Sequence, residues 1–186
     1  MKRSFDLVLV GLALCFLFIP IIVVAFLVGL TSNGPVLYWS DRIGRDNKIF
    51  SMPKFRTMLV GTPALATHLL QNPDQYLTPI GSFLRKSSLD ELPQLWSIAR
   101  GDMSFVGPRP ALFNQYDLID LRKRHHVDRL LPGLTGWAQV NGRDELSIPD
   151  KVKLDAEYLA RQSFTLDLKI IFLTFLKVLQ RDGVTH

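Results

Sequence analysis

The first part of the chain is one long apolar segment. No charged residue occurs between Leu7 and Leu30, and about 20 consecutive apolar residues are enough for a helix to cross the hydrocarbon core of a bilayer. A cleaved signal peptide has a shorter apolar region and a small-residue cleavage site, and this segment does not match that pattern. The sequence therefore predicts two units, a membrane helix over residues 1–31 and a polar domain over 32–186.

The flanks of the apolar segment bear on whether it crosses the membrane. Pro20 lies near its middle, where it removes a helix hydrogen bond and is expected to kink the helix. Basic residues stand on both sides, with Lys2 and Arg3 before it and Arg42 and Arg45 after it. Because positive residues prefer the cytoplasmic side, the pattern favours a re-entrant helix that leaves the membrane on the side it entered. A straight spanning helix is the alternative, since natural spans also contain proline.

Two short runs with the alternation of β-strands follow the membrane segment. They cover residues 36–40 and 48–58 and are joined by a predicted turn over 42–47. Lys54 and Arg56 are two positions apart, so both side chains could project from one face of the second strand. A solvated edge strand would have the same pattern.

Helical spacing of apolar residues marks three later stretches. They are Ile80, Phe83 and Leu84; Leu92, Leu95, Trp96 and Ala99; and Leu168, Ile171, Phe172, Phe175, Leu176 and Leu179. The last stripe fits an amphipathic helix in the membrane interface, and it fits equally well a helix packed on the domain core. Between the strands and these stretches we expect a surface loop with a short helix near residues 64–70. The patterns together predict an α/β fold that is mostly helical with short strands.

Two adjacent carboxylates, Asp90 and Glu91, stand at the start of the middle stretch. Ser88 and Glu91 have the spacing of a capping box, in which the glutamate reaches back to the amide of the capping serine. Acidic residues in a first helical turn are also favoured by the helix dipole. The local pattern alone favours this structural interpretation, and only the cationic residues elsewhere in the chain suggest chemistry.

Two arginines occur in settings that suit phosphate binding. Arg109 lies between two prolines, whose stiff backbone lowers the entropy lost when a guanidinium is aimed at a phosphate. Arg143 ends a glycine-containing stretch, residues 132–143, whose exposed amides could hold phosphate oxygens. That stretch has neither the spacing of a P-loop nor that of a dinucleotide fold. An ordinary turn and an ordinary glycine-rich loop would look the same.

The composition favours an anionic partner. The chain has 22 Lys and Arg against 17 Asp and Glu, a net charge of +5, which suits nucleic acid, acidic lipid or a phosphorylated substrate. The charge is not gathered in a tail, which weighs against nucleic acid. The basic run 122–126 fits either lipid headgroups or a solvated helix face. Cys15 is the single cysteine, so the chain has no disulfide framework and no thiolate metal site.

These segments together resemble the bacterial sugar transferase family, the monotopic polyprenyl-phosphate phosphoglycosyl transferases. The chain looks like the minimal catalytic form of that family. The matching stretches follow the family's order and cover nearly the whole chain: 54–58, Arg85 with 88–95, 101–110, 132–143 and 167–170.

The resemblance implies a reaction at the cytoplasmic face of the bacterial inner membrane. A sugar-1-phosphate passes from a UDP-sugar to polyprenyl phosphate, giving a polyprenyl diphosphate-sugar and UMP at the start of surface glycan assembly. The partners implied are these two substrates and membrane lipids, without nucleic acid, and a homodimer is compatible with the resemblance. The sugar is not identified.

The resemblance also implies the site residues. Asp90 and Glu91 would be catalytic, and Mg²⁺ would be required with Asp90 as its ligand. Glu91 would assist as a partner of the metal or of a proton, and which of the two is open. A carboxylate can act as a nucleophile, so we expect Asp90 to attack the sugar-bearing phosphorus and to form an acyl phosphate that the lipid phosphate then attacks. The expected substrate-binding residues are Lys54, Arg56, Arg85, Arg109, Arg143 and Asp167.

Three positions depart from the family's common pattern. Ile19 precedes Pro20 where a serine is frequent, Ile43 stands where proline is usual, and Leu131 replaces a frequent arginine. None of these three departures falls on Asp90 or Glu91.

Two rival interpretations remain open at this point. A membrane-anchored basic scaffold would use Asp90 and Glu91 only to cap a helix. A membrane phosphohydrolase would release sugar phosphate to water and would not need polyprenyl phosphate.

Overall fold

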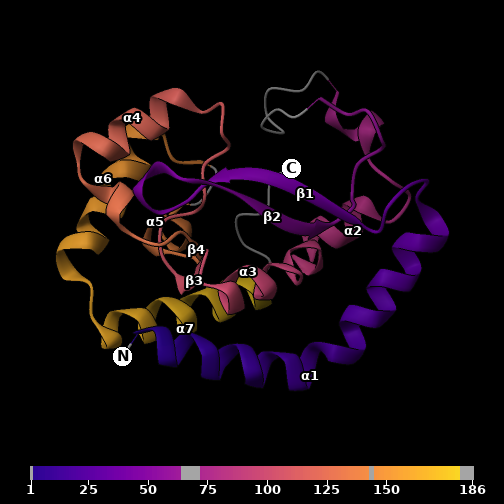
Figure 1. Cartoon of the computed structure of the whole chain (residues 1–186), viewed down its shortest axis with the longest axis horizontal. Coiled ribbons are helices and arrows are strands. Elements are labelled where there is room, and N and C mark those ends of the chain that lie inside the picture. Colours follow the sequence, from indigo (N-terminus) through magenta and orange to yellow (C-terminus); the bar gives the residue numbers. More distant parts are fainter. Residues whose placement is uncertain (1, 64–71, 143–144, 181–186) are drawn as a thin grey trace.

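The apolar N-terminal segment forms one continuous helix, α1 (Lys2–Thr31), with Pro20 inside it. The computed structural model describes residues 2–63, 72–142 and 145–180. The short helix expected near 64–70 and the candidate residue Arg143 lie outside these ranges. In Figure 1, α1 runs along the lower edge of the domain and then turns upward along its side. Among the described residues it is the one helix long and apolar enough to cross a membrane.

An antiparallel hairpin follows, formed by β1 (Leu37–Ile43) and β2 (Ile49–Phe55). The two predicted strands are confirmed, but the predicted turn over 42–47 begins too early. Arg42 pairs with Phe50 and belongs to β1, and the turn is the 3₁₀ segment η1 (Arg45–Asn47). Because β2 ends at Phe55, Arg56 lies beyond the strand.

The second sheet is a parallel pair, β3 (Ser104–Val106) and β4 (Gly133–Thr135). A Cβ atom at Gly133 or Gly136 would collide with the backbone of Gly107, so glycine is what allows these segments to approach so closely. The amide of Gly133 donates to the carbonyl of Pro108. This part of the glycine-containing stretch therefore serves backbone packing.

The remaining elements surround these two sheets (Figure 1). They confirm the prediction of a mostly helical chain with short strands. In order they are η3 (Pro73–Tyr76), α2 (Gly81–Lys86), η4 (Leu89–Glu91), α3 (Gln94–Arg100), α4 (Tyr116–Arg124), η5 (Val127–Arg129), α5 (Trp137–Val140), α6 (Ile148–Arg161) and α7 (Phe164–Gln180).

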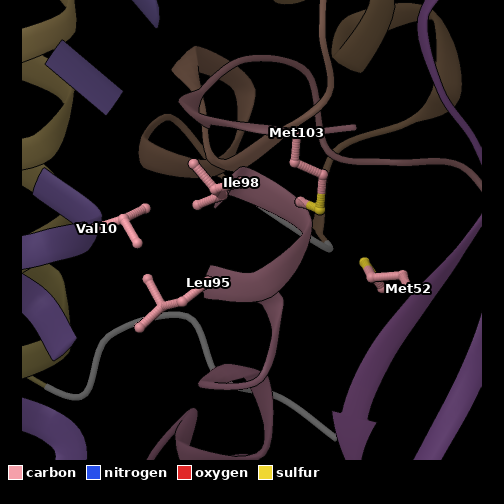
Figure 2. Close-up of a cluster of buried hydrophobic side chains, with 5 residues drawn as sticks. All are labelled: Val10, Met52, Leu95, Ile98 and Met103. Carbon is pink, nitrogen blue, oxygen red and sulfur yellow. The ribbon is translucent and has the colours of Figure 1, made fainter. Parts of the chain in front are cut away.

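The short helix α3 lies at the centre of the core. Figure 2 shows Leu95 and Ile98 of α3 facing Val10 of α1, with Met103 and Met52 of β2 on the other side. The predicted apolar face was partly wrong, because Trp96 is 57% exposed whereas Ile98 is 0% exposed. The helix begins only after Pro93, so Leu92 lies in the turn before it and does not continue the same face.

Helix α7 buries some of its apolar residues in the domain core and leaves others exposed. Leu166 and Ile170 are buried in the core, whereas Leu168, Phe172 and Phe175 remain exposed. The helix therefore packs on the domain and also presents an apolar strip to its surroundings.

The N-terminal end of α1 is attached to the domain by polar contacts. Asp6 is buried and accepts hydrogen bonds from Ser104 Oγ and from the amide of Phe105, both at 3.1 Å. Arg3 donates to the carbonyl of Ala99 at 2.6 Å, and Lys2 Nζ lies 2.6 Å from Asp167 Oδ2.

The C-terminal half of α1 is attached to the same domain by apolar contacts. Val24 and Val28 are buried in one cluster with Phe55 of β2 and Leu84 of α2. Both ends of the helix therefore lie against one domain.

The core position of α3 makes a first prediction. Ile98→Ala is expected to lower the free energy of unfolding by about 2–5 kcal/mol, because it leaves a cavity between α1 and the rest of the core. Trp96→Ala in the same helix is the control, and its loss should be much smaller because the ring is mostly exposed. Chemical denaturation in detergent measures both, and equal losses would contradict the assigned burial of this helix.

Candidate active site

The acidic pair lies in the tight turn η4 between α2 and α3. Ser88 has φ 56°, in the left-handed region, and its side chain makes no capping hydrogen bond. A capping serine needs an extended backbone to reach the amides of the first turn. The capping-box interpretation is therefore wrong, and the carboxylate of Glu91 is used elsewhere.

Glu91 holds two cations from distant parts of the chain. Its Oε1 accepts from Lys54 Nζ at 2.9 Å and from Arg109 Nη2 at 2.8 Å. Burial alone would raise the pKa of Glu91, but the charges and hydrogen bonds of Arg109 and Lys54 outweigh it and hold the pKa well below its usual range. Glu91 therefore stays ionised and fixes both cations in place.

Asp90 is buried but less tightly paired than its neighbour. Its Oδ2 lies 3.9 Å from Lys54 Nζ, beyond hydrogen-bond distance. Burial raises the pKa of Asp90 and the charge of Glu91 adds to this rise, while Lys54, Arg85 and Arg109 oppose it. A desolvated carboxylate among cations suits a nucleophile that attacks an anionic phosphate, because the cations attract the substrate.

The structure also brings Arg85 to the acidic pair. This residue lies on α2, and its Nε donates to Thr57 Oγ1 at 3.1 Å. Burial lowers the pKa of Arg85, and the negative charge of Asp90 partly restores it. Lys54, Arg85 and Arg109, three of the residues expected to bind substrate, thus lie around Asp90 and Glu91.

The backbone of Arg109 is held in place by the side chain of Arg122. Arg122 Nη1 donates to the carbonyl of Arg109 at 2.8 Å, and Arg122 Nη2 lies 2.7 Å from Asp155 Oδ2. The side chains of Arg122 and Asp155 are almost fully buried. At least this arginine of the basic run 122–126 is therefore part of the core and not of a solvated face.

Two predicted substrate-binding residues lie apart from this cluster. Arg56 donates from Nε to the carbonyl of Pro35 at 2.7 Å, in the segment that follows α1. Asp167 is buried between Lys2 and Tyr158, each at 2.6 Å from one of its oxygens. Burial and the carboxylate of Asp167 raise the pKa of Tyr158, so this second polar cluster joins α1, α6 and α7.

Sequence reasoning missed Arg42 as a site residue. Burial and the neighbouring charge of Arg109 lower its pKa to about 10, although Glu91 opposes this. Arg42 was assigned to the turn, but in β1 it points to the same side of the hairpin as Lys54, because side chains alternate along paired strands. If the turn had been placed after Ile43, Arg42 would have been assigned to the same face of the hairpin as Lys54.

Gln94 was also missed, because glutamine gives no clear signal in a sequence. The residue is buried at the start of α3. It lines a small hollow next to the acidic pair together with Arg42, Met52, Lys54, Glu91, Arg109 and Pro110.

The chemistry of the site is compatible with a magnesium ion that takes part of its ligands from a bound phosphate. Among the described residues no group of three or more His, Cys, Asp or Glu side chains is gathered in one place. Mg²⁺ does not require such a group, because it commonly takes one or two carboxylates and completes its shell with phosphate oxygens and water. Asp90 supplies a suitable oxygen, whereas the charge of Glu91 is already neutralised by two cations.

Comparison with known proteins finds a matching family and related chains. The profile of the family described as "Bacterial sugar transferase" matches residues 1–181. The chain is similar to "Uncharacterized sugar transferase EpsL" of Bacillus subtilis strain 168, at 41% identity over 99% of this chain and 90% of the relative. It is also similar to "Exopolysaccharide production protein ExoY" of Rhizobium meliloti strain 1021, at 39% identity over 93% of this chain and 83% of the relative.

The name of a longer relative states the substrates of that protein. This is "UDP-glucose:undecaprenyl-phosphate glucose-1-phosphate transferase" of Escherichia coli K12, at 41% identity over 95% of this chain. The chain spans 40% of the length of that relative.

The two carboxylates are expected to respond to pH with opposite signs. The pKa of Glu91 in the folded chain lies well below its usual 4.5, so its stabilising effect is complete above pH 4.5 and is lost as the pH falls through the lowered pKa. Glu91→Gln should therefore lower the free energy of unfolding at neutral pH by about 3 kcal/mol, since two partly buried cations lose their buried partner. The loss should shrink in acid.

Asp90→Asn provides the matched control. The pKa of Asp90 in the folded chain lies above its usual 3.8, so its charge destabilises the fold as the pH rises through the raised pKa. The variant should thus be more stable than the native chain at neutral pH and equal to it below pH 3.8. Chemical denaturation across this pH range, without divalent cations, measures both variants. The same sign of pH dependence in both would contradict the assigned electrostatics.

Proposed function

This chain belongs to the bacterial sugar transferase family, and from that premise we propose that it transfers a sugar-1-phosphate from a UDP-sugar to undecaprenyl phosphate. The products are UMP and a polyprenyl diphosphate-sugar, on which a surface glycan such as an exopolysaccharide is built. The observation that carries the proposal is the buried Asp90 carboxylate, which lies beside an ionised Glu91 and among Lys54, Arg85 and Arg109. The name of the E. coli relative gives the same pair of substrates.

The reaction proceeds in two displacements at one phosphorus atom. In the first, an oxygen of Asp90 bonds to the sugar-bearing phosphorus and the bond to the UMP oxygen breaks, so that UMP leaves with the electron pair. In the second, an oxygen of the lipid phosphate bonds to the same phosphorus and the bond to Asp90 breaks. The carboxylate is then free for another cycle.

The cations around Asp90 do most of the electrostatic work. Phosphoryl transfer relies on positioning and on neutralisation of charge at the phosphate oxygens. Lys54, Arg85 and Arg109 are close enough to act on the charge of Asp90, and we assign them to the phosphates of the substrates. A bound Mg²⁺ held by Asp90 would add Lewis-acid neutralisation of the diphosphate.

Glu91 acts through the cations that it holds. With its pKa well below the usual range it carries no proton near neutral pH, which makes it a poor general acid. Its contacts with Lys54 and Arg109 instead keep two flexible side chains aimed at the substrate. Glu91 therefore contributes by positioning.

The other predicted ligands have less support. Arg56 and Asp167 have partners away from the acidic pair, so substrate binding by these residues stays a prediction without support from the geometry. Arg143 stays a prediction because it lies outside the described residues.

The attachment of α1 supports a re-entrant topology. Asp6 at one end binds the backbone of β3, and Val28 near the other end packs on Phe55 of β2. A helix that crossed the whole bilayer would separate its two ends by the thickness of the membrane, so they could not both contact one domain on one side. Exposed apolar side chains on α1 and α7 would contact lipid at the cytoplasmic face of the inner membrane: Phe16, Phe18, Ile19, Phe26, Leu168, Phe172 and Phe175.

The reaction is tested by UMP release from detergent-purified protein. A panel of UDP-sugars is supplied with Mg²⁺, with and without undecaprenyl phosphate. We expect lipid-dependent release with one donor, and Asp90→Asn should lower the rate by about 10³-fold or more, since the nucleophile is removed. Asp41→Asn, on the exposed outer side of the hairpin, is the control and should keep the native rate.

The same assay separates the rival interpretations. Without lipid, the native chain should release one equivalent of UMP and gain the mass of a phosphosugar, which Asp90→Asn should not gain. Continued release without lipid would indicate a phosphohydrolase. Equal behaviour of native chain and Asp90→Asn, with no donor turned over, would leave the basic scaffold as the explanation.

The topology is tested by labelling single cysteines in a Cys15→Ser background. Ser4→Cys and Asn33→Cys introduce thiols at exposed positions before and after the apolar segment. A re-entrant helix predicts that a membrane-impermeant maleimide reaches both only in inside-out vesicles. Lys123→Cys on α4 reports the side of the domain, and labelling of either end from the opposite side would establish a spanning helix instead.

A further inference from the structure

A small hollow opens between the β1–β2 hairpin and the turn that carries the acidic pair. It has room for about one water molecule, and its polar lining residues are Arg42, Lys54, Glu91, Gln94 and Arg109. A hollow of this size is much too small to enclose a whole ligand, so a bound molecule would place one group at its mouth. Three cations and one carboxylate line it, which favours a group of negative charge.

The side-chain amide of Gln94 has an N–H₂ group that none of the described residues satisfies. The residue is 2% exposed, and within the described part of the chain its Nε2 has no hydrogen-bond partner. A buried N–H group without an acceptor destabilises a protein, and such groups are rare in native folds. An acceptor from a bound molecule would satisfy it.

Arg42 has a fixed guanidinium with donors to spare. Its Nε donates to Ser40 Oγ at 3.0 Å and its Nη1 to the carbonyl of Pro110 at 3.2 Å. These bonds lock the orientation of the group, and its Nη2 makes no hydrogen bond to any of the described residues. Arg109 lies close enough for the two positive charges to repel, and an anion between them would relieve that repulsion.

We propose that Arg42 and Gln94 form, with Arg109, a subsite for a phosphate group of the substrates. Phosphate oxygens accept hydrogen bonds from a guanidinium and from an amide N–H₂ alike. Asp90 does not line the hollow, so the group held there is not the phosphorus under attack. It is the phosphate that leaves as UMP or the lipid phosphate that arrives. The assignment rests on the transferase function proposed above.

The test uses Gln94→Met and Arg42→Lys. The first keeps the volume of the side chain and removes the N–H₂ group, and the second keeps the charge and removes the planar fork. Gln139→Met is the matched control, because the Nε2 of Gln139 donates to the carbonyl of Leu134 and the residue is absent from the hollow. Three quantities are measured for each chain: KM for the UDP-sugar and for undecaprenyl phosphate, the dissociation constant of UMP, and the melting temperature.

Loss of a hydrogen bond to a charged phosphate is expected to weaken binding about 10-fold to 100-fold in Gln94→Met. A rise in KM for the UDP-sugar together with weaker UMP binding identifies the donor as the source of the phosphate, and a rise in KM for the lipid alone identifies the acceptor. The melting temperature of Gln94→Met should equal or exceed that of the native chain, because an unsatisfied amide has been removed. Arg42→Lys should weaken binding of the same substrate, and the control should bind both substrates normally.

Unchanged KM and UMP binding in both variants would overturn the subsite. A lower melting temperature with unchanged binding would overturn it as well, and would assign an ordered water or a protein group to the amide of Gln94. Failure of the proposed function would be recognised by a different result, since the native chain itself would then show no lipid-dependent UMP release. In that case UMP binding still decides the subsite, and native affinity in the variants, or no binding to any of the chains, would overturn it.

Discussion

The double ion pair of Glu91 is the contact on which the site depends. One buried oxygen joins Lys54 from the hairpin to Arg109 from the segment after β3, although these residues are 37 and 18 positions away in the sequence. Without that carboxylate two cations would face each other next to Asp90. With it, the hairpin, the turn and the proline-flanked segment close around one point, and Asp90 remains the less tightly paired carboxylate, 3.9 Å from Lys54 Nζ.

Arginine side chains of the surrounding fold hold the proline-flanked segment through hydrogen bonds to its backbone carbonyls. Arg122 donates to the carbonyl of Arg109 and Arg42 donates to that of Pro110, so the segment is held at two consecutive carbonyls. Asp155 in turn neutralises Arg122. The backbone at Arg109 is therefore held by residues on β1, α4 and α6, and its guanidinium by Glu91.

The membrane helix is part of the same arrangement. Its Val24 and Val28 pack on Phe55 and Leu84, which are the sequence neighbours of Lys54 and Arg85. Its N-terminal end binds the last turn of α3 through Arg3, and α3 begins three residues after Glu91. The elements that carry Lys54 and Arg85 thus rest directly on the long apolar helix, which suits the lipid acceptor of the proposed reaction.

Two kinds of feature could be predicted from the sequence by itself. One is local secondary structure, and the other is the set of site residues implied by the order of the family's motifs. The apolar run specified α1, alternation specified the two strands, and the resemblance pointed to Asp90, Glu91, Lys54, Arg85 and Arg109, which the structure brings together. The tertiary structure alone decided how Ser88, Trp96, Arg56 and Asp167 are used. It also revealed Arg42 and Gln94. The physical reason is that periodicity describes one element at a time. Which face of α3 is buried depends on where the helix restarts after Pro93, and which cation meets which carboxylate depends on how distant elements pack.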